Sequence, residues 1–313
     1  MSGGDRMDAR AGLALALVLA ACRGHARIDA DERAPSHVDV GASAPVVGAE
    51  PARPAVDPPR PKPTPPPVVR TPPPAPPRVE LLAIPSRTDV RVPVLLLRPT
   101  TAPKLAVVLL AGGDGKLGLA ADGLGPGADN FLLRMRQPLV DAGLLVAIVD
   151  TPSDRPEGLE DARSTTAHAD DLAAVLARLR REHDVPVWMM GTSRGAISAA
   201  NAAARLGTRG PDGLVLLSTI TAGRHETIAD VPLAAITVPT LVVHHRGDGC
   251  KASPPGGTRT LLRKLGHAKR RELLWFGKPS RAAEPDPCDA LTRHGFAGSE
   301  AEVLAGVLAF MRG

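Results

Sequence analysis

One stretch decides the fold of this chain: Val187-Trp188-Met189-Met190-Gly191-Thr192-Ser193-Arg194-Gly195-Ala196-Ile197-Ser198-Ala199-Ala200-Asn201. Its first four residues are apolar and predict a buried strand, and the residues from Ala196 to Ala204 predict a helix. Between them stands Gly191-x-Ser193-x-Gly195, in which the serine occupies a sharp strand-to-helix turn and projects its hydroxyl from the end of the sheet. Such a helix start directs backbone N–H groups towards the serine, where they can stabilise an anion.

The pattern alone is a weak signal. In a chain with 31 glycines among 313 residues, it arises by chance with a probability of roughly one in eight. The alternative interpretation is a glycine-rich turn that contains a serine by coincidence. The strand before the motif and the helix after it are the structural context that the motif requires. This context favours the interpretation of Ser193 as a catalytic nucleophile.

Residues 1–22 predict a lipoprotein signal peptide. A short basic start precedes the apolar run Ala11–Ala20, which has the length of a signal peptide and is too short for a stable membrane span. The run ends in Leu19-Ala20-Ala21-Cys22, which resembles the bacterial lipobox and implies lipidation of Cys22. Arg23 follows where an inner-membrane retention signal has aspartate, which favours the outer membrane. An ordinary cleaved signal peptide is the alternative.

Residues 23–78 predict a disordered tether. There are 16 prolines in residues 35–77, and proline removes N–H donors and fixes φ, so neither helix nor sheet can form. At about 3.1 Å per residue, such a tether reaches on the order of 100 Å. The net charge of +5 is spread along the chain without a basic block joined to aromatic residues, so nucleic-acid binding is not expected.

Residues 79–313 predict one α/β domain, because strands and helices alternate along the chain. Expected strands are Val79–Ile84, Val90–Leu97, Leu105–Leu110, Leu144–Val149, Val187–Met190, Leu214–Ser218, Thr240–His244 and Glu272–Phe276. Expected helices are Phe131–Ala142, Thr166–Glu182, Ala196–Ala204, Leu261–Leu265 and a last one after Ser299. This order predicts a mostly parallel central sheet with helices on both faces.

A serine nucleophile needs a base and an acid that orients the base. Asp248 lies just past the carboxyl end of the strand Thr240–His244, and His294 lies in a loop before the last helix. Ser299-x-x-Glu302 predicts a capping box at the start of that helix. Two alternatives stay open: Asp248, in a Gly-Asp-Gly sequence, forms only a turn, or His294 is a surface histidine.

Residues 79–313 resemble the α/β-hydrolase superfamily, and in particular small bacterial secreted hydrolases of the dienelactone-hydrolase-like group, which lack a large cap. The resemblance rests on Gly191-x-Ser193-x-Gly195, Val243-His244-x-x-x-Asp248 and His294-Gly295-Phe296. It implies Ser193 as nucleophile, His294 as base and then acid, and Asp248 as the orienting acid. It also implies an oxyanion hole formed by the N–H groups of Arg194 and Gly113.

Only a short connector lies between Ser218 and Thr240, which leaves no room for a helical cap. We therefore expect an open pocket, shaped by loops 112–128 and 151–165, that suits an ester or lactone of modest size. His244 and His245 lack a third ligand at suitable spacing, so neither a metal nor another cofactor is expected. For His168, a place on the helix surface or behind the catalytic residues is expected.

These features together predict a serine hydrolase of the esterase or lactonase kind, tethered to the bacterial envelope with its domain in the periplasm. An acyltransferase or peptidase on the same scaffold is one alternative, since the fold does not distinguish them. A binding protein that has lost catalysis is another.

A disulfide between Cys250 and Cys288 is expected within the implied fold. Cys250 lies two residues after Asp248, and Cys288 lies six residues before His294. If the acid and the histidine touch, their loops run side by side and bring the cysteines within bonding range. An exported chain also meets an oxidising compartment. Two free thiols are the alternative.

Overall fold

The computed structural model describes residues 78–120, 123–280 and 284–313, which belong to one compact unit of the chain. The predicted signal peptide 1–22, with Cys22, and all of the predicted tether except Arg78 lie outside the described residues. Among the described residues, no helix is long and apolar enough to cross a membrane.

An eight-stranded sheet forms the centre of the domain, in the order β1-β2-β4-β3-β5-β6-β7-β8. The strands are β1 (Val79–Pro85), β2 (Arg91–Leu97), β3 (Ala106–Leu110), β4 (Leu145–Val149), β5 (Val187–Thr192), β6 (Gly213–Leu217), β7 (Thr240–His245) and β8 (Arg271–Phe276). Strand β2 runs antiparallel to both of its neighbours, and all the other pairs are parallel. The mostly parallel sheet that strand–helix alternation predicts is confirmed.

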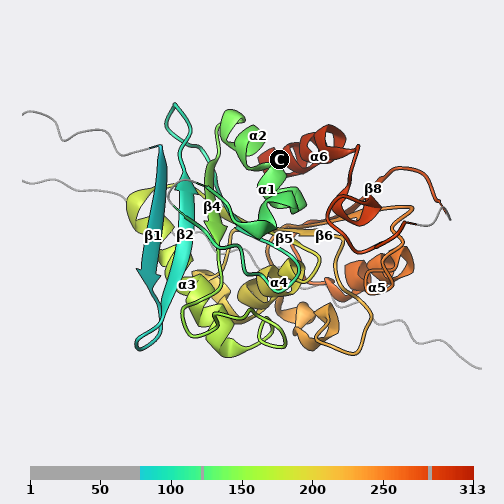
Figure 1. Ribbon diagram of the computed structural model, residues 1–313, viewed down its shortest axis with the longest axis horizontal. Helices are drawn as coiled ribbons and strands as arrows, with labels where there is room; N and C mark the ends of the chain where they lie inside the picture. Colours follow the sequence, from blue (N-terminus) through green and yellow to red (C-terminus); the bar gives the residue numbers. More distant parts are fainter. Residues whose placement is uncertain (1–77, 121–122, 281–283) are drawn as a thin grey trace, which may run out of the picture. The chain divides into compact units, whose positions relative to one another are not determined.

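Helices cover both faces of this sheet (Figure 1). They are α1 (Phe131–Arg134), α2 (Arg136–Asp141), α3 (Thr166–Glu182), α4 (Gly195–Leu206), α5 (Pro255–Lys264) and α6 (Glu300–Arg312). Short 3-10 turns are η1 (Pro126–Asp129), η2 (Gly207–Arg209), η3 (Ile228–Asp230), η4 (Leu233–Ala235) and η5 (Arg293–Gly295). Helices α3, α4 and α5 pack on one face, and α1, α2 and α6 pack on the other.

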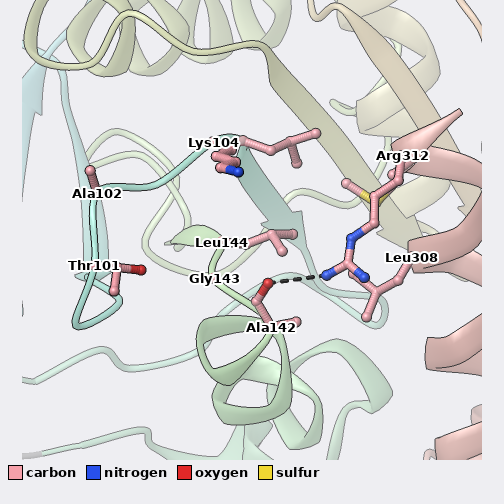
Figure 2. A pocket seen from close by; sticks show the side chains of 10 residues that line it. Thr101, Ala102, Lys104, Ala142, Gly143, Leu144, Leu308 and Arg312 are labelled. Atoms are coloured by element: carbon pink, nitrogen blue, oxygen red, sulfur yellow. Dashed lines mark hydrogen bonds between the residues drawn. The ribbon is translucent and has the colours of Figure 1, made fainter.

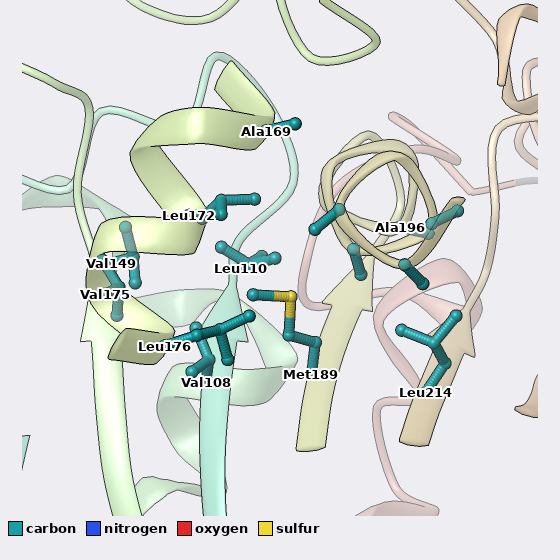
Figure 3. Packing of buried hydrophobic residues seen from close by; sticks show 14 of the residues in the cluster. Val108, Leu110, Val149, Ala169, Leu172, Val175, Leu176, Met189, Ala196 and Leu214 are labelled. Carbon is teal, nitrogen blue, oxygen red and sulfur yellow. The ribbon is translucent and has the colours of Figure 1, made fainter. Parts of the chain in front are cut away.

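Strand β3 shows how one strand contributes to a hydrophobic core on each face of the sheet. Val108 and Leu110 point to the face covered by α3 and α4, where they pack with Leu176 (Figure 3). Val107 and Leu109 point to the opposite face. Because side chains alternate along a strand, only an apolar residue at every position can bury both faces, and all five residues of β3 are buried.

Two helix predictions are wrong in detail. The predicted helix Phe131–Ala142 is divided into α1 and α2 at Met135, because Pro138 lacks an N–H and its ring would clash with the Arg134 carbonyl in a continuous helix. The predicted capping box at Ser299 does not form, since the Ser299 side chain accepts no hydrogen bond from the helix start. The connector Ser218–Thr240 holds only the turns η3 and η4, so the domain lacks a cap, as predicted.

Candidate active site

Ser193 occupies the sharp turn between β5 and α4. Its φ is +54°, a left-handed conformation that is costly for a residue with a Cβ atom and that is concentrated at functional sites. The flanking glycines are required by close packing: a Cβ on Gly191 would lie 2.2 Å from the Gly195 carbonyl oxygen, and one on Gly195 would lie 2.0 Å from the Leu110 carbonyl oxygen. The motif therefore forms a strained turn in which no other residue type fits at either glycine.

Asp248 and His294 form a buried hydrogen-bonded pair. Asp248 follows β7, and its side chain is 0% exposed. Its Oδ2 lies 3.0 Å from Nδ1 of His294, in the turn η5. The backbone N–H of Cys250 donates to the other carboxylate oxygen of Asp248 at 2.9 Å. The acid and the histidine that the sequence predicted are therefore in contact. The contact uses Nδ1 of His294, and in a catalytic triad this nitrogen binds the acid while Nε2 faces the serine.

The charge of Asp248 is stabilised by its neighbours. Burial alone would raise its pKa, but hydrogen bonds from His244, His294 and the Cys250 N–H hold the pKa of Asp248 well below its ordinary range. His244 contributes through Nε2, which lies 3.3 Å from Asp248 Oδ2 and 3.0 Å from the Ser253 carbonyl oxygen. The acid is therefore ionised at neutral pH and can orient an imidazolium.

Ser193 and His294 line the same cavity, which has a volume of about 470 Å³. Gly112 and Gly113 form one wall, and the segment Asp286–Ala290 forms another. Loop 112–128 contributes as predicted. The prediction for loop 151–165 is wrong, because its residues do not line this cavity. Two of them, Leu159 and Arg163, instead donate hydrogen bonds to the carbonyl oxygens of Asp114 and Gly113 in the glycine-rich loop 112–128.

The predicted oxyanion donors lie beside the serine. A Cβ on Gly112 would lie 2.8 Å from the Ser193 Cβ, so the loop that carries Gly113 packs directly against the nucleophile. Arg194 begins the turn into α4. Within the described part of the chain, neither the Gly113 N–H nor the Arg194 N–H donates a hydrogen bond to another group. Both donors remain available to an oxyanion.

Two polar side chains of the site were missed at the sequence level. The Ser253 hydroxyl lies 2.9 Å from both Asp248 Oδ2 and His294 Nδ1, and no local pattern marks this serine. The Asp150 carboxylate accepts the N–H groups of Leu117 at 2.7 Å and Leu119 at 3.0 Å, and so holds the glycine-rich loop. An acid directly after a predicted strand was a signal that could have identified Asp150.

The expected surface position of His168 is wrong. The residue is 4% exposed, and its Nε2 lies 2.9 Å from the Ser198 hydroxyl in α4. Burial, followed by the charges of Arg163 and Arg87, lowers the pKa of His168 to about 3. The ring is therefore neutral at physiological pH and belongs to the packing behind the nucleophile, the second place expected for it.

The loop between β8 and α6, which carries His294, is held by contacts from three other segments and by one contact within the loop. A disulfide joins Cys288 to Cys250 with a Cα–Cα distance of 4.6 Å, which confirms the predicted pair. The Ser218 hydroxyl donates to the His294 carbonyl oxygen at 2.7 Å. Arg134 donates to two carbonyl oxygens of the loop on either side of His294, Ala290 at 3.0 Å and Gly295 at 2.8 Å. Glu284 accepts the Arg293 N–H at 3.0 Å.

A second cavity of about 600 Å³ lies away from these residues, between Lys104, Leu144 and Arg312 (Figure 2). It opens at the amino ends of β3 and β4, whereas Ser193 and Asp248 follow the carboxyl ends of their strands. Among the described residues, no group of three or more His, Cys, Asp or Glu side chains is arranged to hold a metal ion. Because Ser193 and His294 line the cavity of about 470 Å³, that cavity is the candidate active site.

The sheet order, the serine at the β5–α4 turn, the acid after β7 and the histidine after β8 define the α/β-hydrolase fold. The described residues have that fold, with no cap domain among them. No protein-family model and no curated protein sequence matches the chain.

Solved structures with a similar fold include the following three, each from a different organism. Esterase Pf2001 of Pyrococcus furiosus has a TM-score of 0.56 at 12% identity, over 75% of this chain and 90% of that one. An α/β serine hydrolase homologue from Coxiella burnetii has a TM-score of 0.51 at 18% identity, over 74% and 96%. Esterase 2 of Thermogutta terrifontis, phosphoramylated by tabun, has a TM-score of 0.51 at 16% identity, over 77% and 97%. At these identities the likeness establishes the fold alone.

Proposed function

We propose that the chain is a serine hydrolase that cleaves a small carboxylic ester or lactone through an acyl-enzyme. One observation carries the proposal: a strained Ser193 and the buried Asp248–His294 pair converge on the same cavity. A serine hydroxyl is activated when an imidazole accepts its proton and an ionised carboxylate orients the imidazole. Ser193, His294 and Asp248 provide these three groups.

In the proposed reaction these groups act in turn. Ser193 Oγ attacks the carbonyl carbon while its proton passes to His294 Nε2, and Asp248 stabilises the resulting imidazolium. The N–H groups of Gly113 and Arg194 bind the oxyanion. When the tetrahedral intermediate collapses, the leaving alcohol takes the proton from His294. A water molecule then repeats the sequence on the acyl-enzyme and releases the acid.

The first test is substitution of the nucleophile. Ser193→Ala should leave the domain folded and lower the hydrolysis rate of 4-nitrophenyl acetate by about 10⁴-fold or more, since a triad acts as a unit. Circular dichroism checks the fold, and absorbance of the released phenol gives the rate. A folded variant that keeps most of the activity would show that Ser193 is not the nucleophile.

A fluorophosphonate probe separates the hydrolase from a binding protein that has lost catalysis. The probe should label the wild-type protein and not Ser193→Ala; the modification of the Thermogutta terrifontis esterase by an organophosphorus agent supports this choice. Acyltransferase or peptidase activity would also depend on Ser193. Comparison of esters, lactones and amides, with and without an added alcohol acceptor, distinguishes the three reactions.

We further propose that Cys22 carries a lipid that anchors the protein in the bacterial envelope, with the domain in the periplasm. The proposal rests on the basic start, the apolar run and Leu19-Ala20-Ala21-Cys22. A bacterial lipoprotein carries two or three acyl chains, enough for stable attachment. Intact-mass measurement of the mature protein tests it: an unmodified residue at or after Cys22 would contradict lipidation.

A further inference from the structure

Arg163 is a buried cation directly behind the predicted oxyanion hole. The residue is only 2% exposed. Its Nη1 donates to the Ser198 hydroxyl at 3.0 Å, and its Nη2 donates to the Gly113 carbonyl oxygen at 3.2 Å. Among the described residues its Nε has no partner. A buried charge with so few acceptors is costly, so its place calls for a functional explanation.

The surroundings of Arg163 are built to hold a charged guanidinium. Glu226 accepts the backbone N–H groups of Arg163 and Ser164, which places a carboxylate near the guanidinium. Burial lowers the pKa of Arg163 to about 10, while Glu226 raises it, so the side chain stays protonated at neutral pH. The glycine-rich loop folds onto this group, since a Cβ on Gly115 would lie 2.7 Å from Nη2.

The two acceptors of Arg163 belong to the two segments that supply the oxyanion donors. Gly113 lies in the loop after β3, and its own N–H is one predicted donor. Ser198 lies in the first turns of α4, the helix that starts just after Arg194, whose N–H is the other donor. The loop and the helix are not adjacent in sequence, and the guanidinium bridges them.

We propose that Arg163 is a positioning residue that sets the separation of the two oxyanion donors. The inference rests on the proposed hydrolase function. Arg163 acts through Gly113 and Ser198 and does not line the cavity. Its loss should therefore weaken binding of the transition state more than binding of the ester in its ground state, because an oxyanion hole is matched to the charge that develops during reaction.

The test compares Arg163→Gln, Arg163→Lys and Ser198→Ala with the wild type. For 4-nitrophenyl acetate we expect Arg163→Gln to lower kcat by on the order of 10²-fold with little change in KM. A loss of this size is typical when a catalytic group is misplaced. Arg163→Lys keeps the charge and should recover part of the loss. Ser198→Ala removes one acceptor with little volume change and should show a smaller loss of the same kind.

A trifluoromethyl ketone supplies a readout that a purely structural role would not change. Its adduct with serine carries an oxyanion, so its affinity should fall in Arg163→Gln by the same factor as kcat/KM. Arg180→Gln is the control: Arg180, in α3, also donates to two backbone carbonyl oxygens, those of Arg209 at 3.1 Å and Gly210 at 2.7 Å, but both lie in one segment near the amino end of β6. It should change stability without changing kcat or ketone affinity.

The outcomes separate this inference from the proposed function. If the wild type neither hydrolyses esters nor reacts with a fluorophosphonate, both proposals fall. If the wild type is active and folded Arg163→Gln keeps its kcat and ketone affinity, only the role of Arg163 is refuted. Should Arg163→Gln fail to fold, Ser198→Ala and Arg163→Lys decide: normal kcat and ketone affinity in both would overturn the inference.

Discussion

The turn that carries Ser193 and the loop that carries His294 face the same cavity, but they are held in different ways. The turn is fixed by residues within two positions of the serine and by the carbonyl of one neighbouring strand. The loop is fixed by a disulfide and by side chains such as Arg134 and Ser218, which are distant in sequence. The nucleophile is thus placed by local backbone geometry, and the base is placed by tertiary contacts.

Two matched glycines test this contrast with the largest expected effect. A Cβ would lie 2.0 Å from the Leu110 carbonyl oxygen at Gly195, and 1.8 Å from the Ala290 carbonyl oxygen at Gly295. Gly195→Ala strains the centre of the sheet and should lower the free energy of unfolding by about 4 kcal/mol or more. Gly295→Ala strains the buried turn η5, which lies outside the sheet, so the domain should stay folded and lose esterase activity.

Thermal unfolding and ester hydrolysis, measured on both variants, check the prediction. Gly256→Ala is the control, because a Cβ at Gly256 meets no atom within 4 Å. Equal loss of stability at Gly195 and Gly295 would show that the histidine loop is as integral to the fold as the turn.

The same contrast explains what the sequence predicted. The turn at Ser193, the strands around it and the acid after β7 follow from patterns of a few residues, and the structure shows each of them. The division of α1 from α2 was missed, although Pro138 was a visible signal. Ser253 and Arg163 have no local signal, because their roles depend on partners 41 and 50 residues away in sequence.

Removal of the disulfide tests the histidine loop next. The bond closes a loop with a sequence separation of 38 residues, and the chain-entropy relation gives about 3–4 kcal/mol for such a loop. We expect the Cys250→Ser, Cys288→Ser double variant to lose up to that amount in urea unfolding. Mild reduction of the wild type should lower esterase activity before the domain unfolds, since His294 is then less well held.

Thiol titration of the denatured, unreduced protein is the control for that experiment. It should find no free thiol from this pair. Two reactive thiols, or full activity of the reduced protein, would contradict the role of the bond as a clamp on the histidine loop.

Asp248, which holds His294, should make the free energy of unfolding depend on pH. Its pKa is depressed in the folded state and close to about 3.9 in the unfolded chain, so the carboxylate stabilises the fold fully above that value. The contribution disappears as pH falls through the depressed folded pKa. Asp248→Asn should therefore cost on the order of 3 kcal/mol at pH 7, the scale for breaking a buried pair, and less at pH 3. Urea unfolding at both pH values measures the difference, and a constant cost would contradict it.

The smallest effects are expected at the two hydroxyl residues that flank His294. Thr292 precedes η5, and its Oγ1 accepts the His294 N–H at 3.2 Å while donating to the Asp289 carbonyl oxygen at 2.8 Å. Ser299 precedes α6, and its side chain caps nothing. Thr292→Ala should cost about 1 kcal/mol, the typical loss for a cap, and should lower kcat because the histidine backbone is released.

Ser299→Ala should change the free energy of unfolding by less than about 0.5 kcal/mol, as expected for a side chain that makes no capping hydrogen bond, and should leave kcat unchanged. Chemical unfolding and ester hydrolysis, measured on both variants, show which of the two hydroxyl residues holds the histidine loop. The sequence pattern Ser299-x-x-Glu302 favours the opposite order, with Ser299 as the cap that fixes the loop. A larger loss at Ser299 than at Thr292 would mean that the histidine loop is held from its helical end, by a local motif, and the contrast with the serine turn would no longer hold.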